Sequence, residues 1–235
     1  MPIVVGPGIE VGPGITIAST GSEYVTTGLV TYLDAGNPTS YPGSGTTWTS
    51  LVGAFSGTMG AGVAYSAASG GSMTFNGSTG AVVTLVNSAF AALNNNFSVE
   101  FWYSCTNNQP GLVANGTGSN GFVFGYFATT GTAWKVTKYG VIDLQAGTIP
   151  QNTAWHQAVL TYSSTTGVRV YIDGALSGNV ANNTNLSVGS STFNIGKREV
   201  GNHNGSMGIV RWYSTVLSAD DVAQNFNADR ARFGI

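Results

Sequence analysis

Two short apolar runs, Trp155–Tyr162 and Val168–Ile172, are joined by a polar linker over residues 163–167. Their length and their content of β-branched and aromatic residues are typical of strands rather than helices. Asp173-Gly174 follows the second run directly, and hairpin turns prefer this pair because their central positions need positive φ. The stretch therefore predicts two antiparallel strands followed by a tight turn, and with them an all-β domain.

The same pattern recurs along the chain, where apolar segments alternate with turns rich in Gly, Asn and Ser. In the clearest segment, Phe97–Tyr103, the apolar residues alternate and share one face of a strand. The other predicted strands are Leu29–Leu33, Ser72–Phe75, Ala81–Val86, Phe122–Ala128, Ala133–Tyr139, Phe193–Ile195 and Ile209–Tyr213. Many strands at short spacing, without long helical periods between them, predict a two-sheet antiparallel sandwich.

One short C-terminal helix is predicted to begin after Ser218. The Ser218 side chain can cap the first turn, and Asp220 and Asp221 place negative charge where the helix dipole favours it. Val222 and Phe226 are four positions apart and form a narrow apolar face. We expect this face to pack against one of the sheets.

Residues 1–24 differ from the rest of the chain. They contain a tandem repeat, Gly6–Val11 and Gly12–Ile17, in which a Gly-Pro-Gly bend precedes a short apolar segment. Two such strands cannot bury their apolar side alone, so we expect an extended N-terminal β arm that needs another surface, by strand addition or by self-association. An unstructured leader is the alternative. The anchoring residues predicted for the arm are Ile3, Val4, Val5, Ile9, Val11, Ile15 and Ile17.

The composition excludes two classes of partner. Only 8% of the residues are charged, against about 25% in typical soluble proteins, yet 42% are hydrophobic, which is not the signature of a disordered chain. A net charge of −2 offers no basic surface for nucleic acid. No run reaches the ~18 apolar residues of a membrane-spanning helix. We therefore expect a folded protein that binds no nucleic acid and does not insert into a membrane.

The titratable residues do not form a catalytic pattern. Glycoside hydrolysis requires two carboxylates about 5–9 Å apart across the bond, but Glu100 stands alone in its predicted strand and Asp173 is explained by a turn. His156 lies beside Trp155 in a predicted strand, where a structural role is favoured over that of a base. Cys105 is the sole cysteine and is expected to be buried. We predict that the chain is not an enzyme, with no catalytic residue, no metal ligand and no cofactor.

Glycan binding has simpler requirements, namely an aromatic face for the sugar ring and polar groups that fix its hydroxyls. The main candidates are Trp134 and Tyr139 with the loop residues Asn202, His203 and Asn204, and further aromatic candidates are Trp48 and Tyr41. The alternative is that the tryptophans belong to the core and that a turn explains the loop residues.

Several of these segments resemble concanavalin A-like jelly rolls of the laminin-G and pentraxin-like type. The resemblance is carried by Trp155–Gly174, Gly71–Gly77, Phe97–Trp102, Phe193–Gly196 and Asn204–Val222. It implies a jelly-roll sandwich from about residue 26 to 228. We therefore divide the chain into an arm, residues 1–24, and a jelly-roll domain, residues 25–235.

Many domains of this family bind calcium through clustered acidic oxygens, so the resemblance raises the question of a metal. The corresponding run here is Phe75-Asn76-Gly77-Ser78-Thr79-Gly80, in which both acidic positions are missing. A neutral set of ligands binds a hard dication poorly. We therefore do not expect calcium.

A narrower resemblance is to bacteriophage virion proteins, and it is carried by Gly28–Trp48, by Gln224–Ile235 and by the arm. It implies a component of the virion surface. We predict a non-enzymatic capsid decoration protein, anchored by its arm to capsid or other virion proteins, and a homo-oligomer. The alternative is a glycan-binding module of a tail fibre that recognises a host-surface glycan.

Overall fold

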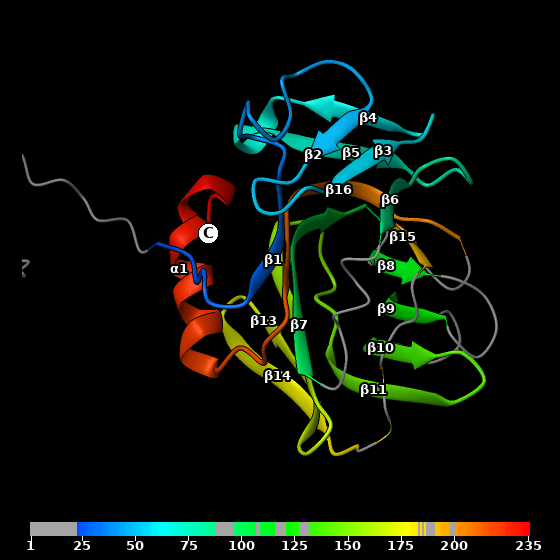
Figure 1. The fold of residues 1–235 in the computed structure, drawn as a ribbon, viewed down its shortest axis with the longest axis vertical. Coiled ribbons are helices and arrows are strands. Elements are labelled where there is room, and N and C mark those ends of the chain that lie inside the picture. The colour runs from blue at the N-terminus through cyan, green and yellow to red at the C-terminus, as the bar shows by residue number, and fades with distance from the viewer. Residues whose placement is uncertain are drawn as a thin grey trace, which may run out of the picture.

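The computed structural model describes residues 23–87, 96–106, 109–115, 121–126, 132–182, 184, 186, 191–197 and 201–235. These residues form two antiparallel eight-stranded sheets, a C-terminal helix and a short 3-10 turn at Ala68–Gly70 (Figure 1). Residues 1–22 of the predicted arm, with all seven anchoring residues, lie outside the described residues, whereas its last two residues, Glu23 and Tyr24, are described.

The first sheet has the strand order β14-β13-β12-β7-β16-β5-β4, with β1 paired to β16. Its strands are β1 (Leu29–Asp34), β4 (Val63–Ser66), β5 (Ser72–Asn76), β7 (Asn96–Cys105), β12 (His156–Ser163), β13 (Gly167–Ile172), β14 (Ala175–Val180) and β16 (Asn204–Tyr213). We call it sheet A. Long β7 and β16 lie side by side at its centre and pair antiparallel from Gly205↔Cys105 to Tyr213↔Ser98.

The second sheet, sheet B, has the order β11-β10-β9-β8-β15-β6-β3-β2. Its strands are β2 (Thr47–Thr49), β3 (Ser56–Met59), β6 (Val83–Asn87), β8 (Gly111–Asn115), β9 (Phe122–Tyr126), β10 (Ala133–Lys138), β11 (Ile142–Thr148) and β15 (Ser191–Ile195). The two sheets confirm the predicted antiparallel sandwich.

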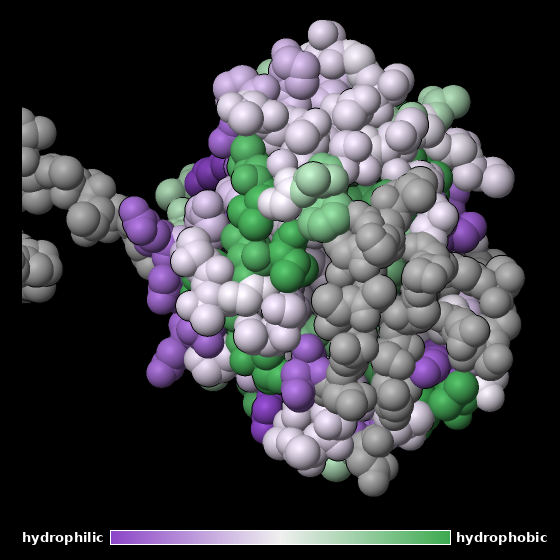
Figure 2. Space-filling model, in the orientation of Figure 1, coloured by the Kyte–Doolittle hydropathy of each residue, from purple (hydrophilic) through white to green (hydrophobic). Residues whose placement is uncertain are grey.

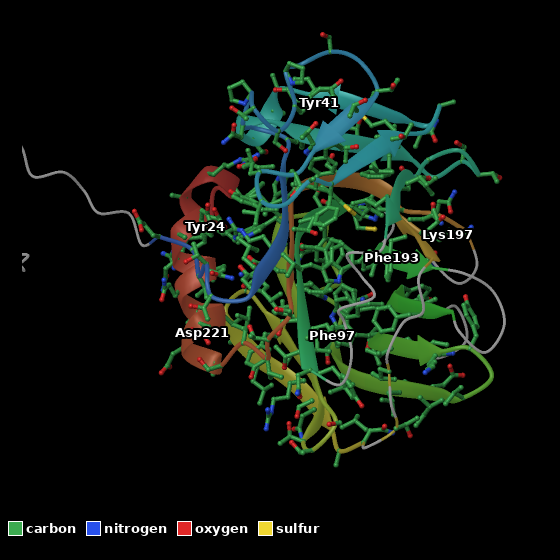
Figure 3. The ribbon with its side chains drawn as sticks, viewed as in Figure 1. Tyr24, Tyr41, Phe97, Phe193, Lys197 and Asp221 are labelled. Carbon is green, nitrogen blue, oxygen red and sulfur yellow. The ribbon has the colours of Figure 1, made fainter. Side chains whose placement is uncertain are left out.

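Large apolar side chains fill the space between the sheets. Phe97 of sheet A and Phe122 of sheet B meet edge to face, with ring centroids 5.9 Å apart. Phe193 and Trp212 make a similar contact at 5.6 Å, and Figure 3 shows Phe97 and Phe193 in the region between the sheets. Burying each such side chain contributes about 1.5–3 kcal/mol, so these contacts hold the two layers together.

The Asp173-Gly174 turn forms as predicted, between β13 and β14. Both residues have positive φ, 51° at Asp173 and 79° at Gly174, as a two-residue hairpin turn requires. The Asp173 carboxylate also accepts a hydrogen bond from the backbone N–H of Gln157, at 2.9 Å. The turn is thereby tied to the start of β12.

Helix α1 (Ala219–Phe233) begins at the predicted cap, where the Ser218 side chain accepts a hydrogen bond from the Asp221 backbone N–H and a complete capping box is present. The helix covers the outer face of sheet A, where Phe226 stacks on Trp102 of β7 at 5.8 Å. Its outward side is hydrophilic (Figure 2). This helix is not of the length and apolarity that a membrane span requires.

Candidate functional site

A hollow of about 430 Å³ lies at the end of the β10–β11 hairpin. We call it the hairpin pocket. The β10–β11 hairpin lies on the opposite side of the molecule from α1 (Figure 1). The pocket's described lining residues are Thr137, Lys138, Tyr139, Gly140, Val141, Ile142 and Asp143.

Strand alternation decides which side chains of β10 face away from the core between the sheets. Trp134 and Val136 are part of the core between the sheets. Lys135 and Thr137 are therefore on the face of β10 that points away from the core. The ladder continues to Tyr139, whose N–H donates to Gly121 O at 2.9 Å, so Tyr139 belongs to the same outward series.

The neighbouring strand adds a carboxylate to this face. Thr137 is paired with Asp143 across the β10–β11 ladder, and directly opposed residues share a face of a sheet. The Lys135 Nζ lies 3.1 Å from Asp143 Oδ2, with the lysine side chain 4% exposed and the aspartate side chain 59% exposed. The pocket therefore combines an ion-paired but accessible carboxylate with a phenol, and the buried Thr137 belongs to its wall.

Of the residues predicted to bind glycan, Tyr139 lines the hairpin pocket and Trp134 does not. The Trp134 ring is fully buried, 5.7 Å from Tyr103 and 5.1 Å from Phe124. Trp48 and Tyr41 are also buried. Because Trp134 and Tyr139 are an odd number of positions apart, one strand puts them on opposite faces, and Trp134 takes the core role that was the alternative.

Asn202, His203 and Asn204 lie at the start of β16, against different elements. His203 is fully buried, its backbone N–H donates to Gly196 O at 2.6 Å, and its Nδ1 accepts from the Gly111 N–H at 3.4 Å. The Asn202 side chain, also buried, donates to the backbone carbonyl of Ser78. These contacts hold loops together, and among the described residues none of them joins Tyr139 at the hairpin pocket.

The run at Asn76, where the family resemblance raised calcium, borders a smaller hollow of about 200 Å³ on β4 and β5. Its described lining contains no carboxylate. In the described part of the chain, no three His, Cys, Asp or Glu side chains gather in a group that could hold a metal ion.

The residues that sequence reasoning missed are Thr137 and Asp143 in the pocket and a buried charge cluster beneath α1. In that cluster Arg211 Nη1 donates to Glu100 Oε1 at 3.1 Å and to Asp229 Oδ2 at 2.6 Å. Burial raises the pKa of Glu100, and the positive charge of Arg211 lowers it. Glu100 and Arg211 are fully buried, so they fasten the helix to the sheet and cannot meet a ligand.

His156 also has a structural environment. Its Nδ1 lies 2.7 Å from Asp173 Oδ2 and its Nε2 lies 2.9 Å from Asn152 Oδ1. Both ring nitrogens are occupied, which links the start of β12 to the β13–β14 turn.

With this geometry, the chain belongs to the concanavalin A-like lectin/glucanases superfamily, whose family model matches residues 75–223. No curated protein matches the sequence.

Solved structures share the fold at low sequence identity. Trypanosoma rangeli sialidase is 17% identical with a TM-score of 0.64, and the match covers 96% of this chain and 36% of the sialidase. The binding domain of botulinum neurotoxin DC in complex with SialylT is 14% identical with a TM-score of 0.66, covering 86% of this chain and 51% of that chain. The binding domain of Paraclostridial Mosquitocidal Protein 1 is 16% identical with a TM-score of 0.63, and the match covers 86% of this chain and 52% of that chain. The chain thus spans between about a third and a half of these proteins.

The comparisons correct the prediction that the chain is not an enzyme. That prediction rested on the lack of a catalytic pattern among the titratable residues, but the same fold occurs in a sialidase. The likeness covers about a third of the sialidase chain at 16–18% identity, so it shows the fold alone and assigns no reaction.

Proposed function

We propose that this domain is a carbohydrate-binding module whose site is the hairpin pocket. The observation that carries the proposal is the joint presence of the Tyr139 side chain and the accessible Asp143 carboxylate in one hollow of about 430 Å³. An aromatic ring packs against the apolar face of a sugar, and a carboxylate accepts hydrogen bonds from its hydroxyls. The lectins in the superfamily and the neurotoxin binding domain solved with SialylT support this class of ligand.

A glycan array probed with the full-length protein tests the proposal. We expect binding to a defined set of glycans, weakened at least about tenfold by Tyr139→Ala because the ring contact is lost. Tyr65→Ala is the matched control, since Tyr65 lies on β4 and does not line the hairpin pocket. Absence of binding to any glycan, or equal loss in both variants, would contradict the proposal.

We also propose that the module is carried on the surface of a bacteriophage particle, as a capsid decoration protein or as part of a tail fibre. The support is the resemblance of Gly28–Trp48 and Gln224–Ile235 to virion proteins, together with the repeats of residues 1–24. Attachment to capsid or other virion proteins, and assembly as a homo-oligomer, belong to this proposal.

Cryo-electron microscopy of intact virions tests the location. Regular copies over the capsid shell would support decoration, and density at the tail alone would support the fibre. Absence of the protein from purified virions would contradict both versions while leaving carbohydrate binding to be judged by the array.

A further inference from the structure

Asp143 supplies the one carboxylate among the described lining residues of the hairpin pocket. Its Oδ2 lies 3.1 Å from the Lys135 Nζ, while the side chain is 59% exposed. A carboxylate offers about four acceptor positions, and a single lysine contact occupies only one of them. The remaining positions can accept hydrogen bonds from ligand donors.

Lys135 compensates the charge of Asp143 from below the surface. Its side chain is 4% exposed, and a buried ammonium group is costly unless it is paired. Lys135 therefore fixes the orientation of the carboxylate and is itself too deeply placed to meet a ligand anion. It is a positioning residue for Asp143.

Thr137 is a second polar residue of the pocket lining, and it stands opposite Asp143 in the ladder. Its Oγ1 is buried and has no hydrogen-bond partner among the described residues. Like Lys135, it therefore belongs to the wall behind Asp143, and we assign it no ligand contact.

We infer that the hairpin pocket selects neutral, hydroxyl-rich sugars through Asp143 and disfavours acidic ones. This inference rests on the proposed carbohydrate-binding function. Adjacent hydroxyls of a neutral sugar donate to Asp143, while the sugar ring packs on Tyr139. The carboxylate of an acidic sugar placed beside the exposed oxygen of Asp143 would lie nearer to this like charge than to the buried ammonium group of Lys135 behind it, so we expect its affinity to be lower by roughly tenfold. An acidic sugar would instead have to pair its carboxylate with the ammonium group of Lys138, which also lines the pocket.

The test uses the full-length protein on an array holding matched neutral, sialylated and uronic-acid glycans, followed by calorimetry on the strongest neutral glycan. We expect neutral glycans to dominate, and we expect Asp143→Asn to raise their Kd at least about tenfold because charge-assisted hydrogen bonds are lost. Asp220→Asn removes an exposed carboxylate in the first turn of α1 and should leave the Kd unchanged.

A second variant guards against misfolding, because Asp143→Asn removes the ion pair between Asp143 and the buried Lys135. The double variant Lys135→Gln with Asp143→Asn removes both charges, and it should fold and bind as weakly as the single variant. Retention of neutral-glycan affinity in the folded double variant would overturn the inference. So would preferential binding of acidic glycans that is lost in Lys138→Gln, an outcome that leaves the proposed function intact. Absence of binding to every glycan would instead refute the proposed function.

Discussion

Arg211 is the residue on which the attachment of α1 to sheet A depends most. It bonds Glu100 of β7 and Asp229 of the helix, and its guanidinium lies 4.5 Å from the ring centroids of both Tyr24 and Tyr32. Asn225 adds a hydrogen bond to Glu100 Oε2 at 2.7 Å. A charged group at zero exposure is stable only while these partners are present.

Replacing Arg211 by Met tests this dependence. The variant leaves the fully buried Glu100 without its cationic partner, and we expect the free energy of unfolding to fall by about 3–5 kcal/mol. Urea denaturation followed by tryptophan fluorescence measures the change. Arg169→Met is the control, expected to shift stability by less than about 0.5 kcal/mol because Arg169 is a half-buried residue of β13. A loss below about 1 kcal/mol for Arg211→Met would show that the cluster is not needed.

Trp134 of β10 and Tyr139, which directly follows β10, have different roles, one in the core and one in the pocket. We expect Trp134→Ala to lower the free energy of unfolding by about 3–5 kcal/mol, because it opens a cavity in the core. Tyr139→Ala should keep a near-normal unfolding midpoint and lose glycan affinity. Thermal unfolding and glycan binding measured on the same two variants check this, and a binding loss without destabilisation in Trp134→Ala would reverse our assignment of the two faces.

At the scale of elements, the sequence predicts those strands that are dense in apolar, β-branched and aromatic residues. β7, β12, β13 and β16 were predicted on this basis, and most of their residues are buried in an almost continuous run. β14 was missed because its sequence, ALSGNV, is mostly exposed and lacks that composition. The pocket was missed because β11, which supplies Asp143, was not recognised as a strand. Its residues Ile142, Leu144 and Ala146 do alternate with more exposed ones, but the segment contains no aromatic residue and few β-branched ones.

The β13–β14 turn and α1 are coupled through Gly174. A Cβ on this residue would lie 3.0 Å from Phe226 Cδ1, and its φ is +79°. Gly43 has a similar φ, +87°, with nothing within 4 Å of its Cβ position. Gly43→Ala therefore measures the backbone cost alone, about 1–2 kcal/mol, and Gly174→Ala should cost measurably more in chemical denaturation. Equal losses of unfolding free energy in the two variants would mean that the Phe226 side chain moves aside without destabilising the fold.

At the scale of the whole molecule, the first described residues and the β10–β11 hairpin, which carries the pocket, lie on opposite sides (Figure 1). Gln224 of α1 donates to Glu23 O at 2.6 Å, and Asn225 Oδ1 accepts from the Val25 N–H at 2.7 Å. Tyr24 lies beside the helix (Figure 3). The chain therefore enters the domain at the helix side, and an anchor formed by the preceding residues would direct the pocket outward.

Two truncations separate anchoring from folding. Removing residues 1–22 keeps every described contact of Glu23, Tyr24 and Val25, so we expect unchanged stability and glycan binding but no attachment to virions. Removing residues 1–25 also deletes the Tyr24 ring over Arg211, 4.5 Å away, and should lower stability by about 1–2 kcal/mol. Co-sedimentation with virions that lack the protein, combined with denaturant unfolding, measures both effects. Attachment that persists without residues 1–22 would show that the anchor lies in the jelly-roll domain, and the repeats of the arm would then need another role.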